Sequence, residues 1–146
     1  MINLQQQLSK AIRIAIKAHE NQLDSHNGRP YIDHPFRVMN AGRTLQEKIV
    51  GILHDVVEDT EWTLKDLSAE GFSPDIVDAV DAMTRRDNES YEEYILRVEK
   101  NPVAVRVKLN DLSDNMDIRR LNELTAQDVE RLHRYLKAYK QLTEKE

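Results

Sequence analysis

The chain has 146 residues, of which 40% are hydrophobic and 32% are charged, and its formal net charge is −5. This length predicts a single domain, residues 1–146, with one buried core, and the composition excludes fibrous and disordered classes. The basic residues are dispersed along the chain. We therefore expect no nucleic-acid partner, because contacts with a phosphate backbone need concentrated Lys and Arg.

The chain has no cysteine, which excludes a disulfide framework, a thiolate zinc site and a Cys nucleophile. Residues 1–7 show no basic segment followed by an apolar core. No run approaches the roughly 18 consecutive apolar residues of a membrane span. We expect a cytoplasmic protein with no membrane partner, and the sequence does not determine its oligomeric state.

Hydrophobic periodicity predicts the first helix over residues 3–22, where apolar side chains recur at three- and four-residue steps. Residues 23–30 are dense in turn formers and predict a loop, which delivers Tyr31 and His34. Pro35 suits the first turn of a helix, where a missing backbone N–H costs nothing. His34 is therefore expected near a helix N-terminus.

Residues 46–59 are predicted to form a central, buried helix, because apolar side chains nearly encircle it. The polar pair His54-Asp55 inside this helix must find partners. Capping hydroxyls three residues before an acidic residue, and Ser or Asn followed by Pro, mark further helix starts. These signals predict helices over residues 63–70, 74–86, 90–100, 102–121 and 126–144.

The last predicted helix, residues 126–144, places its apolar side chains on one stripe, which we expect to pack on the core: Val129, Leu132, Leu136 and Tyr139. No segment with convincing strand alternation competes with the helices. No repeat, low-complexity tract or linker divides the chain. The predicted fold class is all-α, a bundle of seven to eight helices.

Four residues of metal-ligand type are scattered along the chain: His34, the adjacent pair His54 and Asp55, and Asp111. Two imidazoles and two carboxylates suit a hard or borderline divalent ion. The set therefore predicts a catalytic metal site. The residue types alone do not rank Mn²⁺ against Fe²⁺, Zn²⁺ or Mg²⁺.

Two further acidic residues follow on the predicted central helix. Glu58 lies four residues after His54, and Asp59 lies four after Asp55, so all four side chains can lie along one face of the helix. Ordinary solvated residues are the simpler interpretation of Glu58 and Asp59. The helix dipole disfavours carboxylates at a C-terminal end, however, which favours a functional role.

A second polar face is predicted on the helix over residues 102–121. Lys108, Asp111 and Asn115 fall on it at three- and four-residue steps. This face is either a ligand face or a solvated stripe, and the spacing alone leaves both interpretations open.

Several short runs together carry a resemblance to a known family. They are PYIDHP at residues 30–35, LHDVVEDT at 53–60, DAMT at 81–84, and KLND at 108–111 followed by Asn115-Met116. With the order of the four metal-ligand residues, these runs are similar to the HD-domain metal-dependent phosphohydrolases. Within that group, the chain resembles the alarmone (p)ppGpp hydrolase domain of the RelA/SpoT family and its stand-alone small relatives. The resemblance spans about residues 11–121.

The resemblance implies an all-helical HD domain that binds one Mn²⁺ through His34, His54, Asp55 and Asp111. It implies a small nucleotide substrate, guanosine tetra- or pentaphosphate, from which the enzyme removes the 3′-pyrophosphate. Glu58 and Asp59 match the pair that positions and activates water. The residues that we expect to bind substrate are Tyr31, Thr84, Lys108 and Asn115.

The chain departs from the family pattern at several positions. Asp24 stands where the family commonly has an arginine implicated in stacking on the guanine, Asp114 replaces a His or Tyr, and Asp117 replaces an arginine. An acidic side chain cannot supply cation–π stacking and repels phosphates. The sequence therefore predicts the reaction better than the base. The other cations considered for phosphate contact are Arg29, Arg85 and Arg86.

Two other functions stay open from the sequence. One is a 5′-nucleotidase or other phosphomonoesterase of the HD superfamily, and the other is a non-catalytic module that senses a nucleotide. The presence of both Glu58 and Asp59 argues against the second, since a pure binder has little use for a water-activating pair. For His19, a satisfied buried histidine and a supporting role near the site are both considered.

Overall fold

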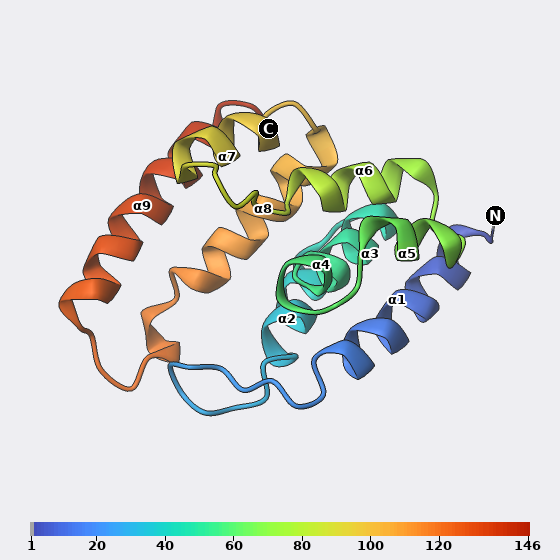
Figure 1. The fold of residues 1–146 in the computed structure, drawn as a ribbon. Coiled ribbons are helices and arrows are strands. Elements are labelled where there is room, and N and C mark those ends of the chain that lie inside the picture. The colour runs from blue at the N-terminus through green and yellow to red at the C-terminus, as the bar shows by residue number, and fades with distance from the viewer. Residues whose placement is uncertain (1) are drawn as a thin grey trace.

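The computed structural model describes residues 2–146 (Figure 1). The helices in chain order are α1 (Leu4–Ala18), α2 (Asp33–Ala41), α3 (Leu45–Leu53), α4 (Val56–Asp59), α5 (Leu64–Ala69), α6 (Pro74–Ala82), α7 (Tyr91–Val98), α8 (Pro102–Asn115) and α9 (Ala126–Thr143), with a short 3₁₀ helix, η1 (Ile118–Arg120), before α9. In these residues, β-type pairing is limited to one isolated bridge between Leu23 and Pro30. The all-α prediction is confirmed.

Local capping explains where several of these helices begin. The side chains of Thr63, Ser90 and Thr125 each accept a hydrogen bond from the backbone N–H three residues on. The acidic side chain of that later residue accepts one in turn from the backbone N–H of the capping residue. These three capping boxes satisfy donors that a helix N-terminus otherwise leaves without partners. The starts predicted from the Thr and Ser positions are therefore confirmed. The C-terminal ends are less well predicted, since α1 ends at Ala18 and α6 at Ala82.

The prediction of one continuous helix over residues 46–59 is wrong. The helix stops after Leu53, and α4 restarts at Val56, with Asp55 between them at φ −102° and ψ −3°. The ring nitrogen Nδ1 of His54 lies 2.6 Å from the Gly51 carbonyl oxygen. A continuous helix would offer that oxygen to the Asp55 backbone N–H. The His54 side chain competes for this acceptor, which favours the break.

The helix predicted over residues 102–121 also ends early. α8 stops at Asn115, and the chain turns through η1 at Ile118–Arg120. The Asp117 side chain accepts a hydrogen bond from the Arg119 backbone N–H at 3.2 Å and so caps this turn. An Asp in that position offers the backbone an alternative to continuing the helix. The turn brings residues 118–120 beside the loop that follows α1.

Helix α3 lies at the centre of the core, as predicted. Ile49, Val50, Ile52 and Leu53 are all fully buried, and the helix packs against α1, α2, α6 and α8. Gly51 lets α2 approach closely, because a Cβ there would lie 3.1 Å from the Met39 backbone. The central helix therefore fixes the positions of the helices that carry the polar residues described below.

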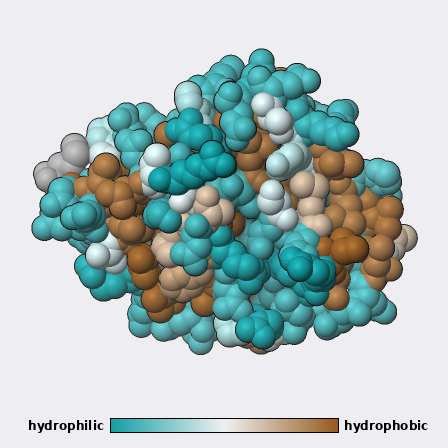
Figure 2. Space-filling view, turned by 180° about the vertical axis from the view of Figure 1, so that it is seen from behind, coloured by the Kyte–Doolittle hydropathy of each residue, from teal (hydrophilic) through white to brown (hydrophobic). Residues whose placement is uncertain are grey.

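The stripe predicted for α9 is only partly correct. Val129 and Leu136 are exposed, whereas Ala138 and Leu142 are buried. Figure 1 shows α9 at the outer edge of the bundle beside α7 and α8, so only one narrow face of it meets the core. Figure 2 shows a mostly hydrophilic face, with hydrophobic side chains gathered toward its two sides. Within residues 2–146, the helices are too short or too polar to cross a membrane.

Candidate metal and active site

A cavity of about 280 Å³ opens among α2, α4, α8 and α9. Its lining includes all four predicted metal ligands, both predicted catalytic carboxylates, and three of the four predicted substrate residues, namely Tyr31, Lys108 and Asn115. Thr84 is not part of the lining. Its hydroxyl donates a hydrogen bond to the Val80 carbonyl oxygen at 2.8 Å.

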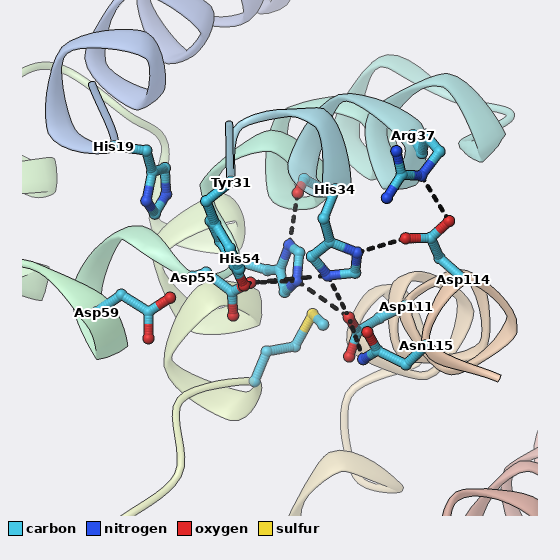
Figure 3. Close-up of polar contacts among 12 residues, drawn as sticks. His19, Tyr31, His34, Arg37, His54, Asp55, Asp59, Asp111, Asp114 and Asn115 are labelled. Atoms are coloured by element: carbon cyan, nitrogen blue, oxygen red, sulfur yellow. Dashed lines mark hydrogen bonds and ion pairs between the residues drawn. The ribbon is translucent and has the colours of Figure 1, made fainter. Parts of the chain in front are cut away.

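Three side chains form a group that could hold a metal ion. His34, His54 and Asp111 each offer a ligand atom, and these atoms lie within 4.8 Å of one another. The Asp111 Oδ1 atom is 2.9 Å from His34 Nε2 and 3.2 Å from His54 Nε2 (Figure 3). All three residues are buried, and they come from α2, the end of α3, and α8. Residues distant in sequence therefore meet because their helices pack on one another.

The other nitrogen of each imidazole ring is already occupied. His54 Nδ1 lies 2.6 Å from the Gly51 carbonyl oxygen, and His34 Nδ1 lies 2.6 Å from Asp114 Oδ2. A carbonyl oxygen and an ionised carboxylate only accept hydrogen bonds, so each Nδ1 carries the proton. In the neutral rings, the Nε2 lone pairs then face Asp111. This donor set fits a divalent ion.

Asp55 adds a second carboxylate beside the histidines. Its Oδ2 atom is 3.0 Å from His54 Nε2 and 3.7 Å from His34 Nε2, and the Tyr31 hydroxyl donates a hydrogen bond to the same oxygen. Burial by itself raises the pKa of Asp55, but the charge of His54 outweighs it and lowers the pKa to about 2. Asp55 is therefore ionised at neutral pH and can act as a ligand.

A buried lysine holds the Asp111 carboxylate. Lys108 Nζ lies 2.8 Å from Asp111 Oδ2, and both side chains are buried. Burial opposes ionisation of Asp111, yet Lys108 and His54 lower its pKa well below the ordinary value. Asn115 Nδ2 also donates to Asp111 Oδ1 at 3.2 Å. Lys108 and Asn115, both predicted to bind substrate, therefore contact the candidate ligand Asp111.

The electrostatics of the two histidines favour a cation at this place. Burial by itself lowers the pKa of His34 and of His54. For His34, hydrogen bonds to Asp111 and Asp114 outweigh burial and raise the pKa, and for His54 the charges of Asp55 and Asp111 raise it well above the ordinary value. The cluster thus attracts protons when no ion is bound. Binding of a metal ion would displace these protons.

Glu58 and Asp59 lie on α4, at the wall of the same cavity. Glu58 Oε1 accepts a hydrogen bond from the Arg85 backbone N–H at 2.9 Å, and Asp59 Oδ2 accepts one from Gln22 at 3.3 Å. Burial raises the pKa of each carboxyl above its ordinary value, and the negative charge of Asp55 adds to the rise. The break after Leu53 thus leaves the two acidic residues beside the metal ligands.

The supporting residues around Asp59 include His19. The His19 ring is 2% exposed, and its Nδ1 atom lies 2.7 Å from Gln22 Oε1. Because Gln22 also donates to Asp59, the three side chains form a short chain of hydrogen bonds. His19 is therefore a buried histidine with a partner near the site.

Two of the arginines considered for phosphate contact, Arg29 and Arg86, lie outside the cavity lining. One arginine that was not considered, Arg134, lies in it. Arg29 pairs with Asp33 at 3.1 Å, and Arg86 pairs with Asp81 at 2.7 Å. Arg85 and Arg134 do line the cavity. Sequence reasoning missed Arg134, along with its lining neighbours Tyr94 and Tyr135. The motif resemblance ended before α9, so only the hydrophobic register of α9 could have indicated which of its residues face inward.

The comparisons with known proteins point to one group of enzymes. No established family model matches the chain. Over 118 residues it is 32% identical to a guanosine-3′,5′-bis(diphosphate) 3′-pyrophosphohydrolase of Haemophilus influenzae, covering 70% of this chain and 17% of the relative. Over 122 residues it is 31% identical to a probable GTP pyrophosphokinase of Mycobacterium leprae, covering 75% of this chain and 15% of the relative. The chain thus spans about a sixth of the length of these curated relatives.

A solved structure has a similar fold. It is described as a metazoan ortholog of SpoT that hydrolyzes ppGpp, and it matches with a TM-score of 0.78 at 22% identity, covering 93% of this chain and 84% of that chain. This match confirms the predicted helical fold. Together with the names of the relatives, it confirms the resemblance to the (p)ppGpp hydrolase domain of the RelA/SpoT enzymes.

Proposed function

We propose that this chain is a metal-dependent phosphohydrolase that removes the 3′-pyrophosphate of guanosine tetra- or pentaphosphate or of a closely related nucleotide. The observation that carries the proposal is the buried meeting of His34, His54 and Asp111 in one cavity with Glu58 and Asp59. Relatives named 3′-pyrophosphohydrolases support the reaction and the substrate class. The donor atoms present fit Mn²⁺, which we propose as the ion.

His34, His54, Asp55 and Asp111 would hold the ion. A bound divalent ion supplies Lewis acidity to phosphoryl oxygens and to water. The hydrogen bonds that Asp114 and the Gly51 carbonyl accept keep the protons on the Nδ1 atoms, so that the Nε2 atoms can donate their lone pairs. Tyr31 orients Asp55 through its hydroxyl.

Glu58 is the group that we propose to accept a proton from the attacking water. Its backbone partner Arg85 holds one carboxylate oxygen, and its raised pKa brings it nearer to neutral pH, where a general base works best. Asp59 then orients the water from the other side of the pair. In the hydrolysis, the water oxygen bonds to phosphorus and the bond from phosphorus to the ribose 3′-oxygen breaks. That oxygen then takes up the proton that Glu58 accepted from the water and becomes the free 3′-hydroxyl.

The cavity also contains cations for a highly charged substrate. Arg85 and Arg134 line it and are exposed, and Arg134 stacks on Tyr91 with its guanidinium carbon 4.8 Å from the ring centroid. We propose that these two arginines neutralise phosphate groups that the metal ion does not contact. Lys108 is a weaker candidate, because its ammonium group is already paired with Asp111.

The nucleoside end would extend toward a larger groove. The cavity shares Asn115 and Tyr135 with a small pocket, which in turn shares His26 and Arg131 with a groove of about 430 Å³ beside the start of α9. A bulky base could therefore lie outside the metal cavity. Asp24 is paired with Arg120 near this path, at 2.8 Å. This arrangement supports a base specificity that differs from that of an enzyme with an arginine at position 24.

The test is a panel of nucleotides incubated with the protein and Mn²⁺, with products identified by mass spectrometry. We expect pyrophosphate release from guanosine tetraphosphate or a near analogue, and loss of the activity with a chelator or with Asp55→Asn. Asp33→Asn is the matched control, because Asp33 lies on α2 and pairs with Arg29 away from the cavity.

The other outcomes identify the alternatives. Release of orthophosphate in place of pyrophosphate would indicate a phosphomonoesterase of the HD superfamily. Tight binding of a nucleotide without turnover would indicate a sensing module. Either result would overturn the proposed reaction.

A further inference from the structure

The two histidines of the metal group are anchored differently. His54 Nδ1 contacts a backbone carbonyl, that of Gly51, whereas His34 Nδ1 contacts a side chain, Asp114, at the same distance of 2.6 Å. Figure 3 shows Asp114 on the far side of the His34 ring from Asp111. The orientation of His34 therefore depends on a residue that can be replaced by mutation.

Asp114 is itself held by two cations. Arg37 Nε donates to Asp114 Oδ1 at 2.7 Å, while Oδ2 is left to His34. Arg120 Nη1 donates to the Asp114 carbonyl oxygen at 3.1 Å and lies 3.8 Å from Oδ2. The Asp114 side chain is 12% exposed. A largely buried carboxylate with this many partners has little freedom to turn away from the histidine.

We propose that Asp114 is a positioning residue for the metal site, and that Arg37 holds Asp114 in place. The inference rests on the proposed metal-dependent function and deepens it. Asp114 fixes the plane of the His34 ring and keeps a proton on Nδ1, so that Nε2, on the side of Asp111, is the atom left to bind an ion. The Asp114 carboxylate places a negative charge behind His34, a proposed metal ligand.

A purely structural role is the competing explanation. Asp114 joins α8 to α2 through His34 and Arg37, so its loss could weaken helix packing alone. A structural role would lower the stability of the protein in chelator and leave its metal affinity unchanged once it is folded. A positioning role lowers the metal affinity of protein that is still folded. The two roles are separable by measuring both quantities.

The experiment titrates the full chain with Mn²⁺ by calorimetry and with Co²⁺ by visible absorption, which reports the ligand geometry. We expect Asp114→Ala to weaken metal affinity by about 10–100-fold, as removal of such a hydrogen-bond partner typically does. Asp114→Asn keeps an oxygen acceptor without the charge, so it should retain the Co²⁺ spectrum and lose less affinity. Arg37→Gln should fall between the parent and Asp114→Ala.

Asp33→Asn and Asp117→Asn are the controls. Each removes one carboxylate, Asp33 on α2 and Asp117 in the turn after α8, and each of these carboxylates pairs with an arginine, Arg29 and Arg119 respectively. Melting curves in chelator show which variants are folded. If the parent binds no Mn²⁺ or Co²⁺, the proposed function itself fails. If the parent binds metal and the metal affinity of folded Asp114→Ala lies within about twofold of it, the positioning role is overturned, because removal of such a partner typically costs about 10–100-fold. If Asp114→Ala does not fold, unchanged affinity in both Asp114→Asn and Arg37→Gln overturns it.

Discussion

The floor of the cavity and its mouth are built in different ways. The floor consists of His34, His54, Asp55 and Asp111, which three packed helices and the turn after α3 bring together. The mouth, two loop segments of residues 22–30 and 118–120, contributes His26 and Arg120 to the small pocket beside the cavity, and side chains join the two segments to each other. Figure 1 shows the loop after α1 passing the segment that follows α8.

The difference lies in what holds each part. At the floor, helix packing around the buried α3 sets the positions, and the polar atoms meet at distances of 2.9–3.2 Å. At the mouth, Asp24 pairs with Arg120 at 2.8 Å, and Asn27 donates to the Arg120 carbonyl oxygen at 3.3 Å. Loop contacts of this kind can change without moving a helix. The positions of the four floor residues are therefore more constrained than those of the two loop segments.

The largest expected effect is at the floor, with Asp111→Ala. It removes a candidate metal ligand and leaves the buried Lys108 ammonium without its carboxylate partner. We expect the loss of Mn²⁺-dependent activity and a loss of about 3–5 kcal/mol in the free energy of unfolding, typical of breaking a buried pair. Urea unfolding in chelator measures the second quantity.

The double variant Asp111→Ala with Lys108→Met tests the cause. If the unpaired ammonium is responsible, the double variant should recover a large part of the lost stability. A double variant no more stable than Asp111→Ala would show that Lys108 reaches solvent in Asp111→Ala. The floor would then be less rigid than helix packing around α3 implies.

The second expected effect separates chemistry from metal binding at the same floor. Glu58→Gln should lower kcat by about 10²–10⁴-fold, the usual contribution of a positioned general base. Metal affinity should stay near that of the parent, because the Glu58 carboxylate is hydrogen-bonded to the Arg85 backbone N–H and is not one of the three residues of the metal group. Steady-state kinetics with Mn²⁺ and calorimetric titration give the two numbers. Equal kcat in parent and variant would assign the proton transfer elsewhere, and Asp59→Asn is the next variant to measure.

The features that were predictable from the sequence are local ones. The capping hydroxyls at Thr63, Ser90 and Thr125 act within four residues, so their effect can be deduced without knowing the fold. The burial of α3 was predictable for a similar reason, since its last five residues, 49–53, are four apolar side chains and one glycine. The metal-ligand types were visible as residues, and their meeting is a consequence of how α2, α3 and α8 pack.

The features that were not predictable depend on competition or on distant partners. The break at His54 arises because a side chain competes with the backbone for the Gly51 carbonyl oxygen, which a periodicity pattern does not contain. In the sequence, Asp24 and Asp114 were only departures from the family pattern. In the structure they pair with Arg120 and Arg37, respectively, and those partners are distant in sequence. Arg134 entered the site only through the packing of α9.

The third expected effect is at the mouth, with Asp24→Asn. Burial by itself raises the pKa of Asp24, but the His26 backbone N–H and Arg120 outweigh it and lower the pKa. A lowered pKa in the folded state adds stability above the ordinary value of about 3.9, and that stability is lost as pH falls through the folded value. We expect a loss of about 0.5–1.5 kcal/mol at neutral pH, modest because the pair lies near the surface.

Unfolding curves at a series of pH values check this expectation. The difference between parent and Asp24→Asn should shrink below about pH 4, where the parent carboxyl becomes protonated. Glu123→Gln is the control beside the mouth, because Glu123 is exposed, and it should give no measurable change. A difference that persists unchanged at low pH would mean that the charge of Asp24 does not join the loops.

The smallest expected effect is a gain in stability at the wall of the cavity. The pKa of Glu58 is raised, mainly by burial and also by Asp55 and Asp59, so the folded state binds its proton more tightly than the unfolded state does. That contribution is present below the ordinary pKa of about 4.3 and is lost as pH rises through the folded value. At neutral pH the ionised carboxylate therefore lowers stability. Glu58→Gln keeps an oxygen for the Arg85 backbone N–H, so it should raise the melting temperature of the metal-free protein slightly at neutral pH.

The gain should vanish near about pH 4, where the parent carboxyl is protonated and resembles the amide. Thermal melts in chelator across this range measure it, with the exposed Glu61→Gln as the control. A lower melting temperature for Glu58→Gln at neutral pH would show that the ionised group stabilises the fold through its bond to Arg85. A gain combined with the loss of kcat would show that Glu58 is kept for catalysis at a cost in stability. The acidic pair would then differ from the metal ligands beneath it, which hold the fold together and serve the chemistry at once.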